Sequence, residues 1–73
     1  MNFPERLNIT RKTKGFTAQQ MAEHLHMQIR GYRKYESGHS SPSLENLVLI
    51  ADLLDVSTDY LLCRDDFLAK NAD

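Results

Sequence analysis

Residues 16–38, FTAQQMAEHLHMQIRGYRKYESG, decide how this chain folds, because they encode two short amphipathic helices with a tight turn between them. The first helix is expected over about 17–25. Thr17 and Gln20 have the Thr-x-x-Gln spacing of a capping box, which satisfies free N–H groups at the start of a helix. The apolar residues of this helix share one helical face: Met21, Ala22 and Leu25.

The second helix of the pair is expected over 28–36, and Gly38 suits the left-handed position that ends a helix. Tyr32 and Tyr35 have the spacing of core anchors, although tyrosines could also stack on bases. His26 occupies the turn, where glycine is usual and histidine is one of the better tolerated alternatives. The basic residues point away from the tyrosines, as side chains entering the major groove of DNA would: Arg30, Arg33 and Lys34.

Gly31 interrupts this basic helix. A glycine there lowers helix stability by about 1 kcal/mol relative to alanine. It is either a tolerated weakness or a position where the helix backbone approaches a phosphate or a base.

The rest of the chain predicts three more helices. The first covers 4–14, with Pro4 in its first turn and Gly15 at its end. Ser43 and Ser57 cap two later helices, the second of which is expected over 58–63. No segment alternates with the period of a strand, so the fold class is all-α. Residues 1–64 form the expected domain, and residues 65–73 form a tail that either extends the last helix or frays.

Length and composition limit the class of protein. Seventy-three residues, 41% of them hydrophobic, suffice for one small domain. The single cysteine, Cys63, has no partner for an internal disulfide, which favours the reducing cytoplasm. No apolar run reaches the roughly 20 residues of a membrane span, and the first residues lack a signal-peptide pattern. A cytoplasmic protein without membrane contact is expected.

Charge is divided unevenly along the chain. Residues 1–42 contain seven Lys or Arg and three acids, for a net charge of +4. Residues 43–73 contain two Lys or Arg and seven acids, for a net charge of −5. This split suggests a basic face that suits phosphates and an acidic face that suits a different partner. The alternative is that the asymmetry belongs to an ordinary solvated surface.

Metal binding and catalysis are poorly supported. His24 and His26 are two residues apart and would point away from each other on a continuous helix, and no ligand set has zinc-like spacing. Cys63 lies at the end of an apolar helix without an oxyanion site to mark it as a nucleophile. We expect no enzyme, no metal and no cofactor.

A longer pattern of residues runs through the helices. It consists of Phe16-Thr17, Met21-Ala22-x-x-Leu25, Tyr32-x-x-Tyr35-Glu36-x-Gly38, Pro42-Ser-Leu44-x-x-Leu47, Ile50-Ala51-x-x-Leu54-x-Val56-Ser57 and Asp59-Tyr60-Leu61-Leu62. In these residues the chain, from about Leu7 to Leu62, resembles the Cro/cI-type helix-turn-helix domain of the XRE regulator family. The resemblance implies a lambda-repressor-like bundle of five helices, in which helices 2 and 3 bind DNA.

The resemblance also implies a role for particular residues. The residues that would face base edges in the major groove are Gln28, Ile29, Arg30, Arg33 and Lys34. Contacts to the DNA backbone, or attraction to it, would come from Thr17, Gln19, Ser37, His39, Lys12 and Lys14. Family members often pair an arginine late in helix 1 with the glutamate that ends helix 3, and the matching residues here are Arg11 and Glu36.

The chain departs from the family pattern at several positions. Ala18 stands where relatives commonly have a glutamine that contacts the DNA backbone, and Thr10 where helix 1 usually has a leucine. His26 replaces the usual glycine of the turn, and Gly31 shortens the reach of one recognition position. The loop beginning at His39 often carries Lys or Arg in relatives. These departures predict an intact fold with modest affinity for phosphates.

Partners follow from the same pattern. One recognition helix reads only a few base pairs, so a palindromic operator and a homodimer are expected. Excess apolar surface on the last two helices is the expected dimer interface: Leu53, Tyr60, Leu61 and Phe67. No effector domain fits, so no small-molecule effector is expected. The function expected is a transcriptional regulator, most often a repressor; the alternative is a protein-interaction module such as an antitoxin or a partner of another regulator.

Overall fold

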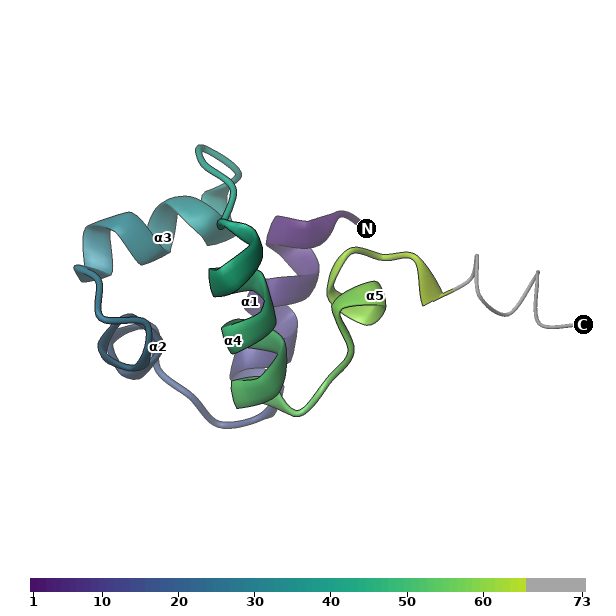
Figure 1. Ribbon diagram of the computed structural model, residues 1–73, viewed down its shortest axis with the longest axis horizontal. Helices are drawn as coiled ribbons and strands as arrows, with labels where there is room; N and C mark the ends of the chain where they lie inside the picture. The colour runs from purple at the N-terminus through teal and green to yellow at the C-terminus, as the bar shows by residue number, and fades with distance from the viewer. Residues whose placement is uncertain (66–73) are drawn as a thin grey trace, which may run out of the picture.

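A computed structural model describes residues 1–65 as a bundle of five α-helices (Figure 1). They are α1 (Phe3–Thr13), α2 (Ala18–His24), α3 (Ile29–Ser37), α4 (Leu44–Leu54) and α5 (Thr58–Leu61). Within those residues there is no strand, and the all-α prediction is confirmed. The tail residues 66–73, including Phe67, lie outside the described part of the chain.

Short polar side chains begin the helices. The hydroxyls of Thr17, Ser43 and Ser57 each accept a hydrogen bond from the backbone N–H three residues later, at 3.0 to 3.1 Å. The Thr17 box is complete, because the Gln20 side chain accepts from the Thr17 N–H at 2.9 Å. α1 has a cap that the sequence reading missed, since Asn2 Oδ1 accepts from the Glu5 N–H at 3.1 Å. Each cap satisfies a donor that would otherwise lack a partner in the first turn.

Left-handed residues end the helices. Gly38 (φ 83°) closes α3, and His26 (φ 55°) turns the chain between α2 and α3, as expected from the sequence. Asp55 (φ 57°) ends α4. The predicted end of the last helix is wrong: α5 stops at Leu61, because Cys63 (φ 61°) turns left-handed there.

The core is a single cluster of buried side chains from all five helices. α2 and α3 lie together at the left of Figure 1, α1 and α4 cross the centre, and α5 lies at the right. Tyr32 is fully buried and Tyr35 is 7% exposed, so their predicted role as core anchors is confirmed. Their rings meet edge to face, with centroids 6.1 Å apart. The other buried apolar residues are Leu7, Met21, Ala22, Leu25, Leu47, Ile50, Ala51, Leu54 and Leu61.

Leu61 was expected at the dimer interface, and the structure does not support that role. Its side chain is fully buried in the core of the described chain, so it is not part of an exposed surface. No helix within residues 1–65 has the length and apolar character that crossing a membrane requires.

Candidate nucleic-acid interface

The connection between α2 and α3 is short and held by backbone hydrogen bonds. The N–H of His26 donates to the Glu23 carbonyl at 3.1 Å, and the N–H of Met27 donates to the Ala22 carbonyl at 3.0 Å. Buried Met21, Ala22, Tyr32 and Tyr35 hold the two helices to the same core. α2 and α3 therefore pack together as one unit.

α3 has one buried face and one basic face. Arg30, Arg33 and Lys34 are exposed on the side away from the tyrosines, and none of them pairs with an acid among residues 1–65. Gln28, at the N-cap, is also exposed and makes no side-chain cap hydrogen bond. Ile29 is half-buried and packs against the core, so only part of its side chain is available to a ligand.

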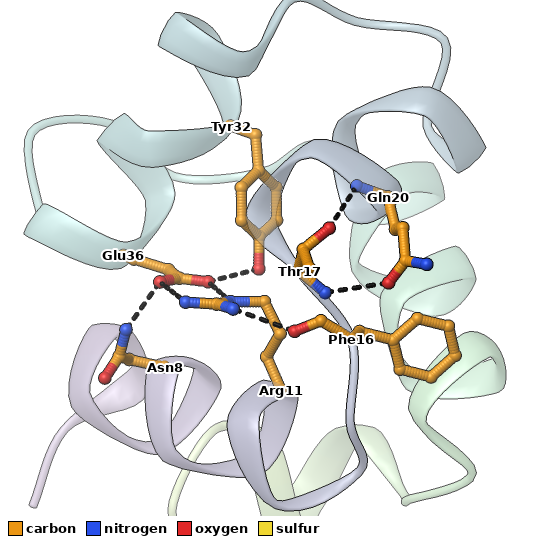
Figure 2. A network of polar contacts seen from close by, with 7 residues as sticks. All are labelled: Asn8, Arg11, Phe16, Thr17, Gln20, Tyr32 and Glu36. Atoms are coloured by element: carbon orange, nitrogen blue, oxygen red, sulfur yellow. Dashed lines mark hydrogen bonds and ion pairs between the residues drawn. The ribbon is translucent and has the colours of Figure 1, made fainter.

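Glu36, the remaining charged residue of α3, lies on the inner side of the helix and binds Arg11 of α1 (Figure 2). Arg11 Nε donates to Glu36 Oε2 at 2.6 Å, and Arg11 Nη2 donates to Oε1 at 3.1 Å. The predicted ion pair is therefore present, in the two-pronged geometry that guanidinium and carboxylate favour. Arg11 Nη1 also donates to the Phe16 carbonyl at 2.8 Å, which ties the start of the α2 segment to the same point.

Two further side chains complete this network. Asn8 Nδ2 donates to Glu36 Oε1 at 2.6 Å, and the Tyr32 hydroxyl donates to Oε2. The sequence reading missed both roles. Helical spacing signals that of Tyr32, which is four residues before Glu36 on α3, whereas Asn8 donates from α1 across to another helix. Figure 2 shows the Glu36 carboxylate between groups from α1 and α3. The network fixes α3 against α1 and leaves the outer face of α3 free of negative charge.

The ionisation of the network follows from these contacts. Burial alone would raise the pKa of Glu36, but hydrogen bonds from Arg11, Tyr32 and Asn8 lower it below its ordinary value. Burial and the neighbouring carboxylate raise the pKa of the Tyr32 hydroxyl, which stays a proton donor. The hydrogen bond to Glu36 raises the pKa of Arg11. At neutral pH both Arg11 and Glu36 are charged, and each oxygen of the Glu36 carboxylate accepts a hydrogen bond.

The six candidates for contacts to a nucleic-acid backbone are all exposed: Thr17, Gln19, Ser37, His39, Lys12 and Lys14. Thr17 Oγ1 accepts from the Gln20 N–H at 3.1 Å, which leaves its hydroxyl hydrogen for an external acceptor. The Ser37 hydroxyl already has partners within the chain, because its Oγ lies 2.8 Å from His39 Nδ1 and 3.3 Å from the Lys34 carbonyl oxygen. The pair of Ser37 and His39 gives the loop after α3 a defined shape.

Of the expected dimer residues, two lie at the surface of the described chain. Tyr60 is 38% exposed, with the Arg6 guanidinium 4.4 Å above its ring centroid. Leu53 is half-buried against the core. Arg6 also donates to Asp65 Oδ1 at 2.9 Å, which links α1 to the residues after α5. Leu62, two residues after Tyr60 in the sequence, is 42% exposed and was not among the expected dimer residues.

Metal ligands are not gathered in the described part of the chain. Residues 1–65 contain no group of three His, Cys, Asp or Glu side chains that could hold an ion. Cys63 is half-buried, and its sulfur lies 3.9 Å from the Leu61 carbonyl.

Two short helices in a fixed pair, joined by a tight turn, with the second helix exposed and basic, define a helix-turn-helix unit. The model of the Helix-turn-helix family matches residues 7–61, and the chain belongs to this family.

Similar proteins include regulators of phage origin. The chain is 45% identical over 60 residues to the SPbeta prophage-derived uncharacterized HTH-type transcriptional regulator YonR of Bacillus subtilis, covering 82% of this chain and 56% of YonR. It is 45% identical over 64 residues to the cryptic phage CTXphi transcriptional repressor RstR of Vibrio cholerae, covering 88% of this chain and 57% of RstR. The chain thus spans a little over half the length of these relatives.

Solved structures share the fold. The P22 c2 repressor, solved in complex with a synthetic operator, is 25% identical with a TM-score of 0.81, covering 89% of this chain and 98% of that one. A transcriptional regulator from Listeria innocua is 34% identical with a TM-score of 0.79, covering 85% of this chain and 58% of that one. The predicted lambda-repressor-like arrangement is confirmed.

Proposed function

We propose that this protein binds double-stranded DNA sequence-specifically, with α3 in the major groove, and represses transcription by occupying an operator. The observation that carries the proposal is the outer face of α3, where Arg30, Arg33 and Lys34 are exposed while Glu36 is bound inward by Arg11. A relative named as a transcriptional repressor and a structural neighbour solved with an operator support it. The protein acts in the cytoplasm through binding alone, without catalysis.

The residues divide into two kinds of contact. Arg30 or Lys34 pairs with guanine O6 and N7, and the exposed part of Ile29 touches a thymine methyl. Gln28 and Arg33 complete the base-reading set. Thr17, Gln19, Lys12 and Lys14, with Ser37 and His39 after α3, contact or attract the phosphates and set the register of the protein on the duplex.

A second copy of the chain completes the site. Two α3 helices about 34 Å apart would read the two halves of a palindromic operator. The surface that supports pairing lies at α5, where Tyr60 and Leu62 are exposed and Leu53 is close to the surface. We assign the homodimer to this end of the molecule.

The test begins with selection of bound DNA from a random library, followed by mobility shift at two salt concentrations. Affinity for the selected site should fall steeply with salt, because each phosphate contact releases counterions. Arg30→Ala should cost about 1–3 kcal/mol and relax preference at one base, whereas Lys14→Ala should weaken all sequences alike. Glu45→Gln, on the acidic side of α4, is the control that should change neither.

Charge reversal decides whether α3 is the reading helix. The double variant Arg30→Glu with Lys34→Glu should abolish binding to the selected site while circular dichroism shows an intact fold. Retention of specific binding by that variant would refute the assigned face. Absence of any selected sequence would favour a protein-interaction module instead.

A further inference from the structure

The outward side of α4 is apolar and hollowed, and the proposed function does not use it. Leu44 is 81% exposed, Val48 50% and Leu49 48%. One hollow is lined by Leu44, Glu45, Val48 and Leu49. A second is lined by His24, Leu25, Leu49, Asp52 and Leu53, and it meets the first at Leu49. The residues that line the two hollows extend from the start of α4 to the end of α2 and are here together called the α4 groove.

These exposed side chains are not part of the buried core. α4 already contributes Leu47, Ile50, Ala51 and Leu54 to the core from its opposite side. A single exposed leucine is ordinary on a protein surface, but several apolar side chains that line two adjoining hollows indicate a binding surface. The α4 groove is therefore apolar beyond what the core of this chain uses.

The charge of the groove selects its partner. Glu45 lines the first hollow and Asp52 the second, and no Lys or Arg of the described residues lines either one. Negative charge beside the apolar strip repels nucleic acid and anionic lipid surfaces. It favours a partner that places cations next to its apolar side chains.

A second copy of this chain fits the groove poorly. A two-fold axis between Val48 and Leu49 would pair antiparallel α4 helices and bring Glu45 opposite Asp52 of the other copy. Two like-charged contacts of this kind, one on each side of the axis, oppose self-association. The homodimer proposed at α5 shares only Leu53 with the groove, and it leaves Leu44, Val48 and Leu49 exposed.

We propose that the α4 groove binds an amphipathic helix of another protein, with apolar anchors at helical spacing and Lys or Arg beside them. Leu44, Val48 and Leu49 would contact the anchors, as in other complexes where a helix lies in a groove. Glu45 and Asp52 would pair with the flanking cations. The groove contains none of the residues assigned to DNA, so such a partner can join the protein without displacing it from an operator.

Two helical peptides test the proposal against the whole 73-residue chain. The first carries Leu at i, i+3, i+4 and i+7 with Lys beside them, and the second has Glu in place of every Lys. Amide chemical shifts of the labelled protein should move with the Lys peptide at residues 44–53. The Glu peptide should bind about fivefold more weakly or worse, as expected from loss of two exposed ion pairs.

Variants locate the contact. Leu49→Gln should weaken binding of the Lys peptide, whereas Ile9→Gln, at an equally exposed apolar residue of α1, should not. The double variant Glu45→Lys with Asp52→Lys should reverse the preference, so that the Glu peptide binds better. Thermal melts confirm that each variant is folded, and mobility shift with operator DNA reports the proposed DNA function separately.

Four outcomes would overturn the proposal. They are equal binding of both peptides, shifts confined to another face, no binding of either peptide at about 1 mM, and self-association that Leu49→Gln abolishes. The last would assign the groove to a second copy of the chain. None of these results depends on whether the protein binds DNA.

Discussion

At the residue scale, Thr10 is a polar residue buried in the core. It is 5% exposed, and its Oγ1 has no hydrogen-bond partner among residues 1–65. Thr10→Val keeps the shape and removes the buried hydroxyl. We expect the free energy of unfolding to rise by about 1 kcal/mol, because an unsatisfied polar atom is costly to bury. Urea unfolding of both proteins measures the change.

Thr13→Val is the matched control, since Thr13 is exposed on the same helix. The same substitution there should change stability by less than about 0.5 kcal/mol. Equal effects at the two positions would mean that burial of the Thr10 hydroxyl is not the cause.

Glu36 should make the protein sensitive to acid. Its pKa in the folded protein lies below the ordinary value, so its contribution to stability is complete above about pH 4.3. That contribution is lost as pH falls through the lower folded pKa. Glu36→Gln should cost about 3 kcal/mol at neutral pH, because Arg11 is left buried without its carboxylate. The cost should shrink as pH falls, which chemical unfolding at several pH values measures.

Asn8→Ala provides a milder version of the same experiment. It removes one donor to Glu36 and should cost about 1 kcal/mol while leaving the ion pair intact. A cost of Glu36→Gln that stays constant down to pH 3 would contradict the assigned role of the carboxylate.

At the scale of the element, Gly31 weakens α3, the helix proposed to read bases. A Cβ added at Gly31 would lie 3.1 Å from Met27 Cε, the mobile end of a flexible side chain that can move aside. Gly31→Ala should therefore stabilise the protein by about 0.5–1 kcal/mol. DNA affinity should stay unchanged if the glycine is only a tolerated weakness. Thermal unfolding and mobility shift measure the two quantities.

Gly38→Ala is the contrasting variant. A Cβ there would meet Pro4 Cγ at an ordinary 3.5 Å, but φ is +83°, so the cost comes from the backbone. Destabilisation by about 1 kcal/mol is expected. Loss of DNA affinity in Gly31→Ala, with a stable fold, would show instead that the backbone of α3 approaches the DNA at Gly31.

Helix positions could be predicted because their signals are local. Thr17, Ser43 and Ser57 mark three helix starts through side chains that bond to the backbone three residues later. The end of α5 could not be predicted, because Cys63 adopts a left-handed conformation for which its residue type has no preference. Capping is a contact within one turn of the chain, whereas no residue type near Cys63 marks the end of α5.

In the candidate site, too, some features could be predicted from the sequence and others could not. The basic face of α3 follows from helical spacing around Tyr32, and the Arg11–Glu36 pair follows from the family pattern. The burial of Leu61 could not be predicted, because an apolar residue in a short helix suits a core or an interface equally. Helical spacing also did not show that Asn8 donates to Glu36, since that contact needs α1 and α3 to be placed in space.

At the scale of the whole molecule, the basic and acidic residues that are separated along the sequence also lie on different surfaces of the fold. The outer side of α3 carries Arg30, Arg33 and Lys34, and the α4 groove carries Glu45 and Asp52. Arg11 and Glu36 join the basic helix to α1 without contributing charge to the outer side of α3. A net charge of −1 is therefore compatible with DNA binding, because the field at α3 is local.

The proposed dimer can be tested at the opposite end from α3. Leu62→Lys adds a charge at a 42% exposed residue after α5, where the homodimer is assigned. Sedimentation should show a dimer for the unchanged protein at high micromolar concentration and a monomer for the variant. Affinity for a palindromic operator should fall by about tenfold or more, whereas affinity for one isolated half-site should not change, because α3 is intact.

Leu44→Lys separates this surface from the α4 groove. Leu44 is the more exposed of the two leucines, so a charge there should leave both the dimer and the operator affinity as they are. A dimer that survives Leu62→Lys but is lost in Leu44→Lys would move the two-fold interface to α4. That result would also remove the free face on which the helix-binding proposal depends, because one apolar strip cannot serve both partners at once. Measuring the two variants side by side therefore decides which end of the molecule pairs and which remains for another protein.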